Sequence, residues 1–470
     1  MKTNVKVAER VIAPKALSSY EKLKRTCCTA LLGEDNFYED GQTLKDRVVT
    51  YLNEVSESQA VNVVKFAKDD NKLRHMPLYL LDNMLKKGWV TSDLVEHVCT
   101  RPDDITEILA MYWNDSNNKH GLPKQLLKGL QKSFNNFDEY QLSKYRANDN
   151  EVKLRDALCI VRPDPNKSKN PKQSETYNKI VNNELKMDKN TWEVAISACG
   201  KNTEKKRNEW TRLLTEKTEK GLPKLGALAL LRNLRNMNDC GVDHRVIKEA
   251  LKNASMKKIL PFQIIGAARY ASPDLSDVLQ TKLLESISGC YDKLEGDTLF
   301  LLDISGSMGA TLSGKSDLTR LDAGAGVAAI LNSICESSVL YAFNHNLTPL
   351  PSAYKGLAMV AEVNRIAGGG TYVIDCTNDA IKEYTKSHGG EFPSRVIVIT
   401  DEQDNRYSSY RKYNTNEPLM NLPKSCKGYV VNVGTYENGV NYNDKCWTRV
   451  SGWSEGIVKY ISEYEKLGIR

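Results

Sequence analysis

Near Asp297 the sequence changes from one repeating pattern to another, and this change constrains the fold more than any other feature. Before it, apolar residues recur at helical spacing, as in Leu78-Leu81-Leu85, and Pro or Gly turn signals stop the helices after a few turns. After it, short β-rich apolar runs alternate with helical stretches. A chain of 470 residues exceeds what one hydrophobic core usually spans. We therefore expect two domains, 1–296 and 297–470.

The first domain is predicted to be all-α. Many short amphipathic helices in succession are typical of an α-solenoid, in which each helix pair buries its apolar face against the next. Self-similarity at a fixed period is weak, so these repeats are degenerate. Segment 162–173 interrupts the pattern because it holds three prolines and four cations. It is either a solvated connector or a flexible arm that engages phosphates.

The second domain is predicted to be a doubly wound α/β domain. Apolar runs predict strands at 298–303, 339–343, 395–400 and 429–433, and helices are expected at 320–337, 372–387 and 453–467. Continuous apolar strands that alternate with helices indicate a parallel sheet covered on both faces. Ligands of such sheets bind at the carboxyl ends of the strands.

Oxygen-bearing side chains gather at these predicted strand ends. The first strand ends in an Asp-x-Ser-x-Ser sequence, another is followed by an acid, and a triple-glycine loop is followed by a threonine. Two carboxylates and three hydroxyls, with no His or Cys, suit a hard divalent cation, and we expect Mg²⁺. The alternative is that the serines cap the following helix. The five candidate ligands are Asp303, Ser305, Ser307, Thr371 and Asp401.

No catalytic constellation is found, so we predict that the protein is not an enzyme. An aspartyl-phosphate hydrolase needs a second carboxylate two positions after Asp303, where Ser305 stands. The Gly-x-Ser-x-Gly elbow of serine hydrolases, the Walker A loop and the dinucleotide fingerprint are all missing from the sequence.

Charge is distributed unevenly along the chain. The net charge is +7, and residues 151–250 alone hold 21 Lys and Arg against 14 Asp and Glu. A local basic excess favours an anionic partner, most commonly a nucleic acid, although a solvated lysine-rich helical surface would look the same. The 11 cysteines are irregularly spaced, without Cys-x-x-Cys, which predicts free thiols in a reducing compartment, the cytoplasm. No apolar stretch is long enough to span a membrane.

Both halves resemble known modules. The five candidate ligands resemble the metal-ion-dependent adhesion site of von Willebrand factor A domains. The helical part resembles the TROVE module of the Ro autoantigen family over most of residues 15–290. Matching segments are 35–41, 74–79, 122–132, 140–145, 191–198 and 229–237. A von Willebrand A domain follows the TROVE module in that family too, so the chain resembles a bacterial or phage-like member.

The resemblance implies a HEAT-like helical-repeat ring, closed by the A domain, with a basic central hole. It further implies a monomer of the Ro ribonucleoprotein type that takes part in RNA quality control or processing. Such a protein binds small non-coding Y RNA on its outer surface and single-stranded ends of misfolded RNA through the hole. Bacterial relatives are associated with an exoribonuclease.

The resemblance also suggests which cations contact RNA. Candidate outer-surface contacts, which match a basic stretch used by the family, are Lys144, Arg146, Lys153, Arg155 and Arg162. In that stretch the family has a His before Lys-Pro, whereas this chain reads Ile160-Val161-Arg162-Pro163. Candidate hole-lining cations are Lys205, Lys206, Arg207, Arg212, Arg232 and Arg235.

The sequence is also consistent with a different function. The metal site could recruit a protein carboxylate, as in von Willebrand A-type interaction proteins, while the helical part serves only as a scaffold.

Overall fold

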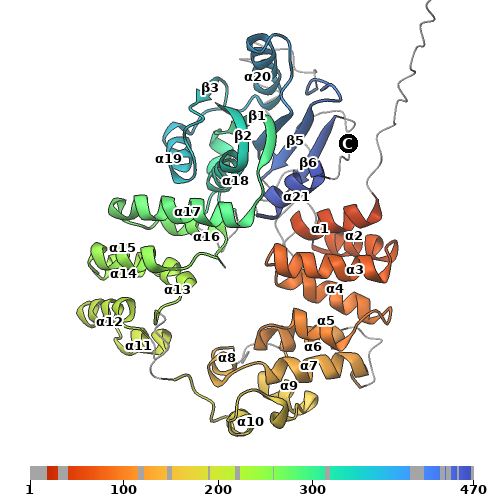
Figure 1. Ribbon diagram of the computed structural model, residues 1–470, viewed down its shortest axis with the longest axis vertical. Coiled ribbons are helices and arrows are strands. Elements are labelled where there is room, and N and C mark those ends of the chain that lie inside the picture. Colours follow the sequence, from red (N-terminus) through yellow and green to blue (C-terminus); the bar gives the residue numbers. More distant parts are fainter. Residues whose placement is uncertain are drawn as a thin grey trace, which may run out of the picture.

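The protein, seen in a computed structural model, combines a helical part with a C-terminal α/β part (Figure 1). The predicted order of the two parts is confirmed. Within the described residues there are 21 α-helices and one six-stranded sheet. The structure describes residues 18–29, 41–114, 121–145, 151–188, 191–217, 223–257, 259–312, 318–402, 418–433, 440, 446–451 and 455–466.

The helical part curves into a ring that the α/β part closes (Figure 1). At one end α17 (Ser276–Cys290) packs on α18 (Arg320–Ile334) of the α/β part. At the other end α1 (Ser19–Thr29) packs on α21 (Glu455–Lys466). Helices from the two ends of the chain therefore lie side by side, and closure of the ring depends on this pairing.

The first half of the ring has an apolar core of its own, which extends from Leu23 to Leu185. It is built by successive packing of neighbouring helices, such as α5 on α7 and α6 on α9. Its elements are α1, α2 (Gly41–Asn53), α3 (Glu57–Lys65), the π-helical turn η1 (Phe66–Asp70), α4 (His75–Leu85), α5 (Ser92–Val98), α6 (Pro102–Asn114), α7 (Lys124–Asn135), α8 (Glu139–Lys144), α9 (Leu154–Val161), the 3₁₀ turn η2 (Pro165–Lys167) and α10 (Gln173–Val181).

The second half of the ring shares its core with the sheet. Apolar side chains from Trp210 onward continue without a break into α18 and one face of the sheet. Among the described residues this core does not merge with that of the first half. Its ring elements are α11 (Trp192–Ala198), α12 (Thr203–Thr215), α13 (Ala227–Arg232), α14 (Leu234–Asp239), α15 (His244–Asn253), α16 (Pro261–Ala268), the 3₁₀ turn η3 (Pro273–Leu275) and α17.

The sheet has the strand order β3-β2-β1-β4-β5-β6, and every strand is parallel to its neighbours except β3. Alternate side chains of its central strands face α18 and α21 on one side and α20 on the other. Its elements are β1 (Leu294–Asp303), the 3₁₀ turn η4 (Gly306–Gly309), α18, β2 (Cys335–Phe343), β3 (Leu347–Leu350), α19 (Leu357–Ile366), α20 (Val373–Ser387), β4 (Arg395–Thr400), β5 (Lys427–Asn432), β6 (Trp447–Ser451) and α21.

The structure corrects the sequence prediction at three places in this part. The helix expected at 320–337 ends at Ile334, because Cys335–Ser338 pair with β1 and extend β2 toward its start. The sheet is mixed, not purely parallel, since β3 returns antiparallel beside β2. Strand β6 was not expected, because its residues Trp447–Ser451 do not form a continuous apolar run.

Segment 162–173 packs on the ring and does not extend from it as an arm. The Ser168 hydroxyl donates to the carbonyl oxygen of Asn135 at 2.7 Å. The buried Gln173 amide donates to the carbonyl oxygens of Phe134 and Phe137 at 3.3 and 3.1 Å. These bonds reach carbonyl groups in the last turn of α7 and just after it, where the helix leaves acceptors to be satisfied, so the segment packs on that helix end.

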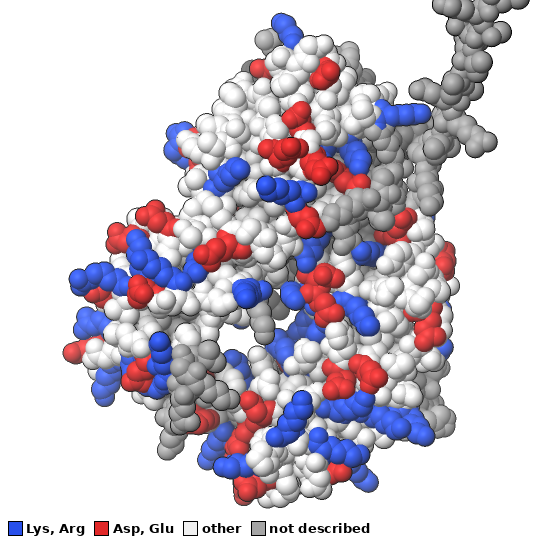
Figure 2. Space-filling view, in the orientation of Figure 1, with Lys and Arg blue, Asp and Glu red and all other residues white. Residues whose placement is uncertain are grey.

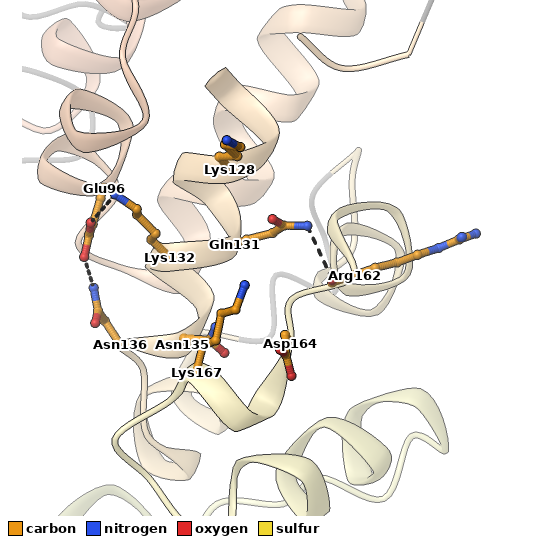
Figure 3. Close-up of a pocket in the computed structure, with 9 residues that line it drawn as sticks. All are labelled: Glu96, Lys128, Gln131, Lys132, Asn135, Asn136, Arg162, Asp164 and Lys167. Atoms are coloured by element: carbon orange, nitrogen blue, oxygen red, sulfur yellow. Dashed lines mark hydrogen bonds and ion pairs between the residues drawn. The ribbon is translucent and has the colours of Figure 1, made fainter. Parts of the chain in front are cut away.

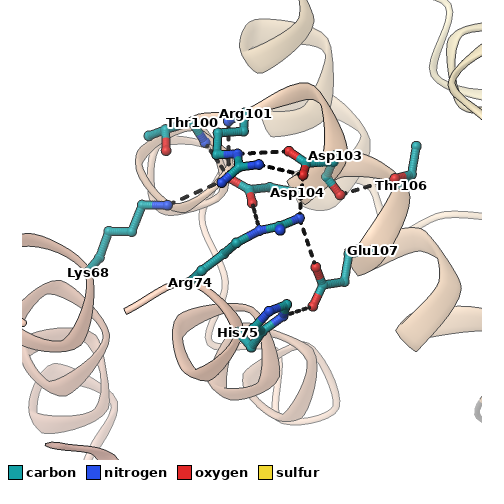
Figure 4. Close-up of polar contacts among 9 residues, drawn as sticks. All are labelled: Lys68, Arg74, His75, Thr100, Arg101, Asp103, Asp104, Thr106 and Glu107. Atoms are coloured by element: carbon teal, nitrogen blue, oxygen red, sulfur yellow. Dashed lines mark hydrogen bonds and ion pairs between the residues drawn. The ribbon is translucent and has the colours of Figure 1, made fainter. Parts of the chain in front are cut away.

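A polar network fastens α4 to α6 in the first half of the ring (Figure 4). The Arg74 guanidinium contacts three carboxylates of α6, those of Asp103, Asp104 and Glu107, at 2.6, 3.1 and 3.3 Å. Asp104 is fully buried, and it also accepts the backbone N–H groups of Thr100 and Arg101. Because each acid has a directional partner, the network fixes how one helix sits on the next.

No helix in the described part of the chain is both long and apolar enough to span a membrane. The ten cysteines whose side chains are described are all free thiols.

Two helical glycines make a matched test of the ring's packing. A Cβ at Gly129 of α7 would lie 2.3 Å from the Val95 Cβ and 2.7 Å from the Ser92 carbonyl oxygen, so α5 would have to move. We expect Gly129→Ala to lower the free energy of unfolding by about 1–3 kcal/mol.

At Gly266 of α16 nothing lies within 4 Å of a Cβ. There the same change should raise stability by about 0.5–1 kcal/mol, because alanine favours helix. Denaturant unfolding followed by circular dichroism measures both, and equal effects would contradict the close approach of α5 and α7.

Candidate metal centre and nucleic-acid interface

Four of the five predicted metal ligands form one hydrogen-bonded cluster at the carboxyl ends of β1 and β4. Asp303 is the last residue of β1, and its Oδ1 accepts the backbone N–H of Ser305 at 2.9 Å. The Ser305 and Ser307 hydroxyls lie 3.0 Å apart. The Ser307 hydroxyl donates to Oδ1 of Asp401 at 3.2 Å. Side chains separated by 94 residues in the sequence are therefore in direct contact.

The glycine-rich loop brings Thr371 to the same place. Gly368 donates its N–H to the carbonyl oxygen of Ile304 at 2.7 Å, and Gly306 donates to that of Gly369 at 2.9 Å. Gly369 has a φ of +93°, and a Cβ there would lie 2.8 Å from Nδ1 of His345. Only glycine combines this φ with so close a backbone approach. Thr371 follows the loop and is itself buried.

Both carboxylates of the cluster are fully buried. Burial raises the pKa of the Asp303 carboxyl to about 7, although hydrogen bonds from Ser305 and Thr400 oppose this. The Thr400 hydroxyl donates to Oδ2 of Asp303 at 2.6 Å. A buried carboxylate is costly unless a positive charge or hydrogen-bond donors compensate it. The donor set therefore fits a hard cation bound by oxygens.

Arg320 supplies a positive charge that compensates one of these carboxylates, and the sequence did not predict this role. Nη1 of Arg320, at the start of α18, lies 2.9 Å from Oδ2 of Asp401, and both side chains are buried. Arg320 belongs to no motif, so no local signal marks it. Within the described residues there is no group of three or more His, Cys, Asp and Glu that could hold a metal. A cation here would depend on the hydroxyls as well as on the two acids.

The predicted outer-surface cations differ in whether they already pair with another side chain of the protein. Lys144 is exposed but already paired within the protein, since its ammonium lies 2.6 Å from Glu193 and 3.2 Å from the Tyr140 hydroxyl. Burial would lower the pKa of Lys144, but these partners raise it above its ordinary value. Lys153 and Arg155 are exposed at the start of α9 and make no ion pair with a described residue. Arg146 lies outside the described residues.

Arg162 closes α9 in an unusual conformation. It is exposed, it has a φ of +49°, and its Nε donates to the carbonyl oxygen of Cys159 at 3.2 Å. A left-handed conformation at a non-glycine residue ends a helix sharply and is held by its surroundings. The chain therefore turns back here toward α7.

The predicted hole-lining cations fall into two groups. Lys205, Lys206 and Arg207 on α12 make no ion pair with a described residue, nor does Arg232. Arg212 pairs with Glu209 of the same helix at 2.5 Å and with Glu216, just after the helix end, at 2.8 Å. The exposed Arg235 lies over the ring of Tyr270, 5.1 Å from its centroid. All six belong to the second half of the ring, whereas the outer-surface candidates belong to the first.

The space-filling view shows a hole through the ring, with Lys and Arg side chains on its rim (Figure 2). Acidic side chains are also present on this face, interspersed with the basic ones (Figure 2). An open passage lined partly by cations can attract a polyanion, and its width limits what passes through.

No protein-family model and no curated protein matches the sequence. Among solved structures, that of the Ro (RSR) protein of Deinococcus radiodurans aligns with 95% of this chain and 99% of its own, with a TM-score of 0.61 and 16% identity. A structure described as an aerotolerance-related membrane protein from Bacteroides fragilis aligns with 36% of this chain at a TM-score of 0.21, too low to support an argument. The first likeness shows that this chain has the fold of a bacterial Ro protein.

The contact between Lys144 and Glu193 joins the two halves of the ring and predicts a structural role for this lysine. We expect Lys144→Gln and Glu193→Gln each to lower the free energy of unfolding, with a coupling energy of about 0.5–1 kcal/mol in a double-mutant cycle, because both side chains remain partly exposed to solvent. Lys153→Gln, an exposed neighbour, should leave stability unchanged. A coupling energy of zero in denaturant unfolding would show that the pair contributes nothing.

Proposed function

We propose that this protein is a bacterial or phage-like member of the Ro family and a non-catalytic RNA-binding protein. The observation that carries the proposal is the closed ring with an open hole, in a chain that has the fold of a Ro protein along almost its whole length (Figure 2). The cations of α12 and α9 that lack an acidic partner among the described residues support it. Free thiols agree with the cytoplasm as its location.

The mechanism proposed is selection by shape and charge. Lys and Arg bind the phosphate backbone with little reading of sequence, and the binding weakens with salt. A narrow hole admits a single strand, whereas a duplex is too wide, so RNAs with a free single-stranded end are retained. The outer surface near α9 is proposed to hold the structured part of a Y-like small RNA. An exoribonuclease is the proposed protein partner, acting on the RNA that the monomeric ring holds.

A hairpin RNA with and without a 3′ single-stranded tail tests this selection. The tailed form should bind at least about tenfold more tightly, because each phosphate contact or stacked base in the hole adds on the order of 1 kcal/mol. Both forms are titrated at one fixed salt concentration, with filter binding or fluorescence anisotropy as the readout.

A control for length is the same number of nucleotides added as extra base pairs, which should not tighten binding in this way. Equal affinities for all three RNAs would rule out threading and leave binding to the outer surface. No binding to any RNA would favour the alternative function, recruitment of a protein carboxylate by the metal centre.

We further infer that the α/β part is a von Willebrand A-like domain whose Asp303, Ser305, Ser307, Thr371 and Asp401 hold a divalent cation, Mg²⁺. The buried carboxylates and their hydrogen-bonded serines support this inference. The cation would polarise a ligand carboxylate or phosphate bound beside Ser307, the half-buried member of the set. Arg320 already offsets part of the charge of Asp401, so the net attraction for a cation depends mainly on Asp303.

Thermal unfolding with and without Mg²⁺ tests the metal assignment. A cation that binds only the folded protein raises the free energy of unfolding by about 2.7 kcal/mol when its free concentration is 100 times its dissociation constant. Asp303→Asn should abolish the Mg²⁺-dependent rise in Tm while the affinity for tailed RNA persists. The control is Asp379→Ala, which removes a partly exposed acid of α20 and should keep the rise in Tm. Loss of RNA binding in a folded Asp303→Asn protein would contradict the separation of the two sites.

A further inference from the structure

Glu402 has an unusual backbone conformation beside the candidate metal centre. Within the described residues four non-glycine residues have a positive φ, and three of them are exposed, namely Lys72, Arg162 and Asn183. At Arg162, for example, the side chain extends away from α7 (Figure 3). Glu402, which directly follows Asp401 and has a φ of +57°, is instead only 1% exposed. A left-handed conformation at a buried acidic residue costs free energy, so the surrounding structure must hold it.

An ion pair from the edge of the sheet holds the Glu402 side chain. Oε1 of Glu402 lies 2.8 Å from Nε of Arg449, which belongs to the edge strand β6. The Glu402 side chain is fully buried, and that of Arg449 is 21% exposed. A buried carboxylate loses much more when its arginine is removed than an exposed one does, so this pair can offset the strain of the left-handed backbone. The preceding acid, Asp401, pairs with a different arginine, Arg320 of α18.

The backbone N–H of Glu402 begins a chain of hydrogen bonds that ends at the candidate metal ligand Asp303. This N–H donates to the hydroxyl oxygen of Thr400 at 3.0 Å, and the bond is buried. The Thr400 hydroxyl donates in turn to Oδ2 of Asp303 at 2.6 Å. A hydroxyl has one hydrogen and rotates to suit its partners. Because the N–H of Glu402 takes an acceptor position of this hydroxyl, the hydrogen is directed to Asp303.

The left-handed conformation is what keeps this chain intact. The peptide group between Asp401 and Glu402 is planar and rotates as one unit. A negative φ at Glu402 is reached most simply by flipping this peptide group, which turns its N–H away from Thr400. The Thr400 hydroxyl would then be free to rotate away from Asp303.

Two donors orient the Asp303 carboxylate. The N–H of Ser305 bonds Oδ1 at 2.9 Å, and the Thr400 hydroxyl bonds Oδ2. An ionised carboxylate has about four acceptor positions, so both oxygens keep the capacity to bind a cation. Hydrogen-bond partners of a ligating carboxylate fix its orientation, and their removal typically weakens metal binding.

We propose that Glu402 is a positioning residue of the candidate metal centre. Its left-handed backbone, held by Arg449, keeps the peptide N–H on Thr400 and thereby keeps the Thr400 hydroxyl on Asp303. The inference rests on the proposed divalent-cation site and extends it to three residues that do not bind the cation themselves. The metal centre thus depends on a contact at the far edge of the sheet.

Two substitutions at position 402 separate backbone conformation from charge. Glu402→Gly and Glu402→Ala both remove the carboxylate, but glycine adopts a positive φ freely and alanine does not. The dissociation constant for Mg²⁺ is measured by calorimetry. Glu402→Gly should bind Mg²⁺ within about threefold of the wild-type protein, and Glu402→Ala at least about tenfold more weakly. Equal losses in both variants would show that Glu402 acts through charge or packing and would overturn the inference.

A pair of variants at Thr400 tests the next contact without changing the left-handed residue. Thr400→Val removes the hydroxyl at nearly constant volume and should weaken Mg²⁺ binding at least about tenfold. Thr400→Ser keeps the hydroxyl and should bind within about threefold. Wild-type affinity in Thr400→Val would contradict the role of this hydroxyl and overturn the inference.

Melting temperatures without Mg²⁺ test the backbone conformation by itself. Glu402→Gly should melt at a higher temperature than Glu402→Ala, because only glycine accommodates a positive φ without strain. The reverse order would overturn the inference whatever the metal affinities. If the wild-type protein binds Mg²⁺ and the two variants at position 402 lose it equally, only the role of Glu402 fails. If the wild-type protein binds no Mg²⁺, the metal centre itself fails, and this role fails with it.

Discussion

Burial of α18 is the interaction on which the ring, the sheet and the candidate metal centre all depend. Ser333 is the only residue of this helix that is not buried. Near its start Arg320 pairs with Asp401 of the candidate metal centre, and two residues later Asp322 pairs with Arg269 of the ring at 2.8 Å. One turn further, Gly326 lies so close to Phe262 of α16 that a Cβ would come within 2.6 Å of its ring. One helix therefore positions the candidate metal ligand Asp401 and joins the α/β part to the ring.

The two proposed binding functions use different physical means and different parts of the chain. The candidate metal centre is small and built from two buried acids and three hydroxyls, so its ligand must satisfy strict geometry. The RNA-binding surfaces are exposed lysines and arginines on helix faces and turns, where charge matters more than exact position. Arg320 and Asp322, two residues apart on one helix, pair with Asp401 of the first kind of site and with Arg269 of the ring that carries the second.

The sequence predicted correctly those structural features that are determined by residues close together along the chain. The strand at 395–400 and the Asp-x-Ser-x-Ser turn were placed correctly because a buried strand and the turn after it leave a continuous signal in the sequence. Contacts between distant residues outside the predicted metal ligands were not predicted. Arg320 lies 81 residues from Asp401, and Lys144 lies 49 residues from Glu193. An isolated charge looks the same in the sequence whether it is solvated or paired. The pairing of Lys144 with Glu193 therefore left no mark in the sequence, and Lys144 stays a predicted RNA contact.

The two separate apolar cores have a consequence for how the protein unfolds. The first half of the ring is held by its own core, whereas the second half shares a core with the sheet. Across the joint between α8 and α11 the halves meet through polar contacts such as Tyr140 with Glu193, which contribute little free energy when partly hydrated. Cooperativity is transmitted mainly by shared apolar packing, so the first half is expected to form one folding unit, and the second half to form another together with the sheet. The amides of the first half can then exchange with solvent hydrogen through an opening that leaves the sheet folded.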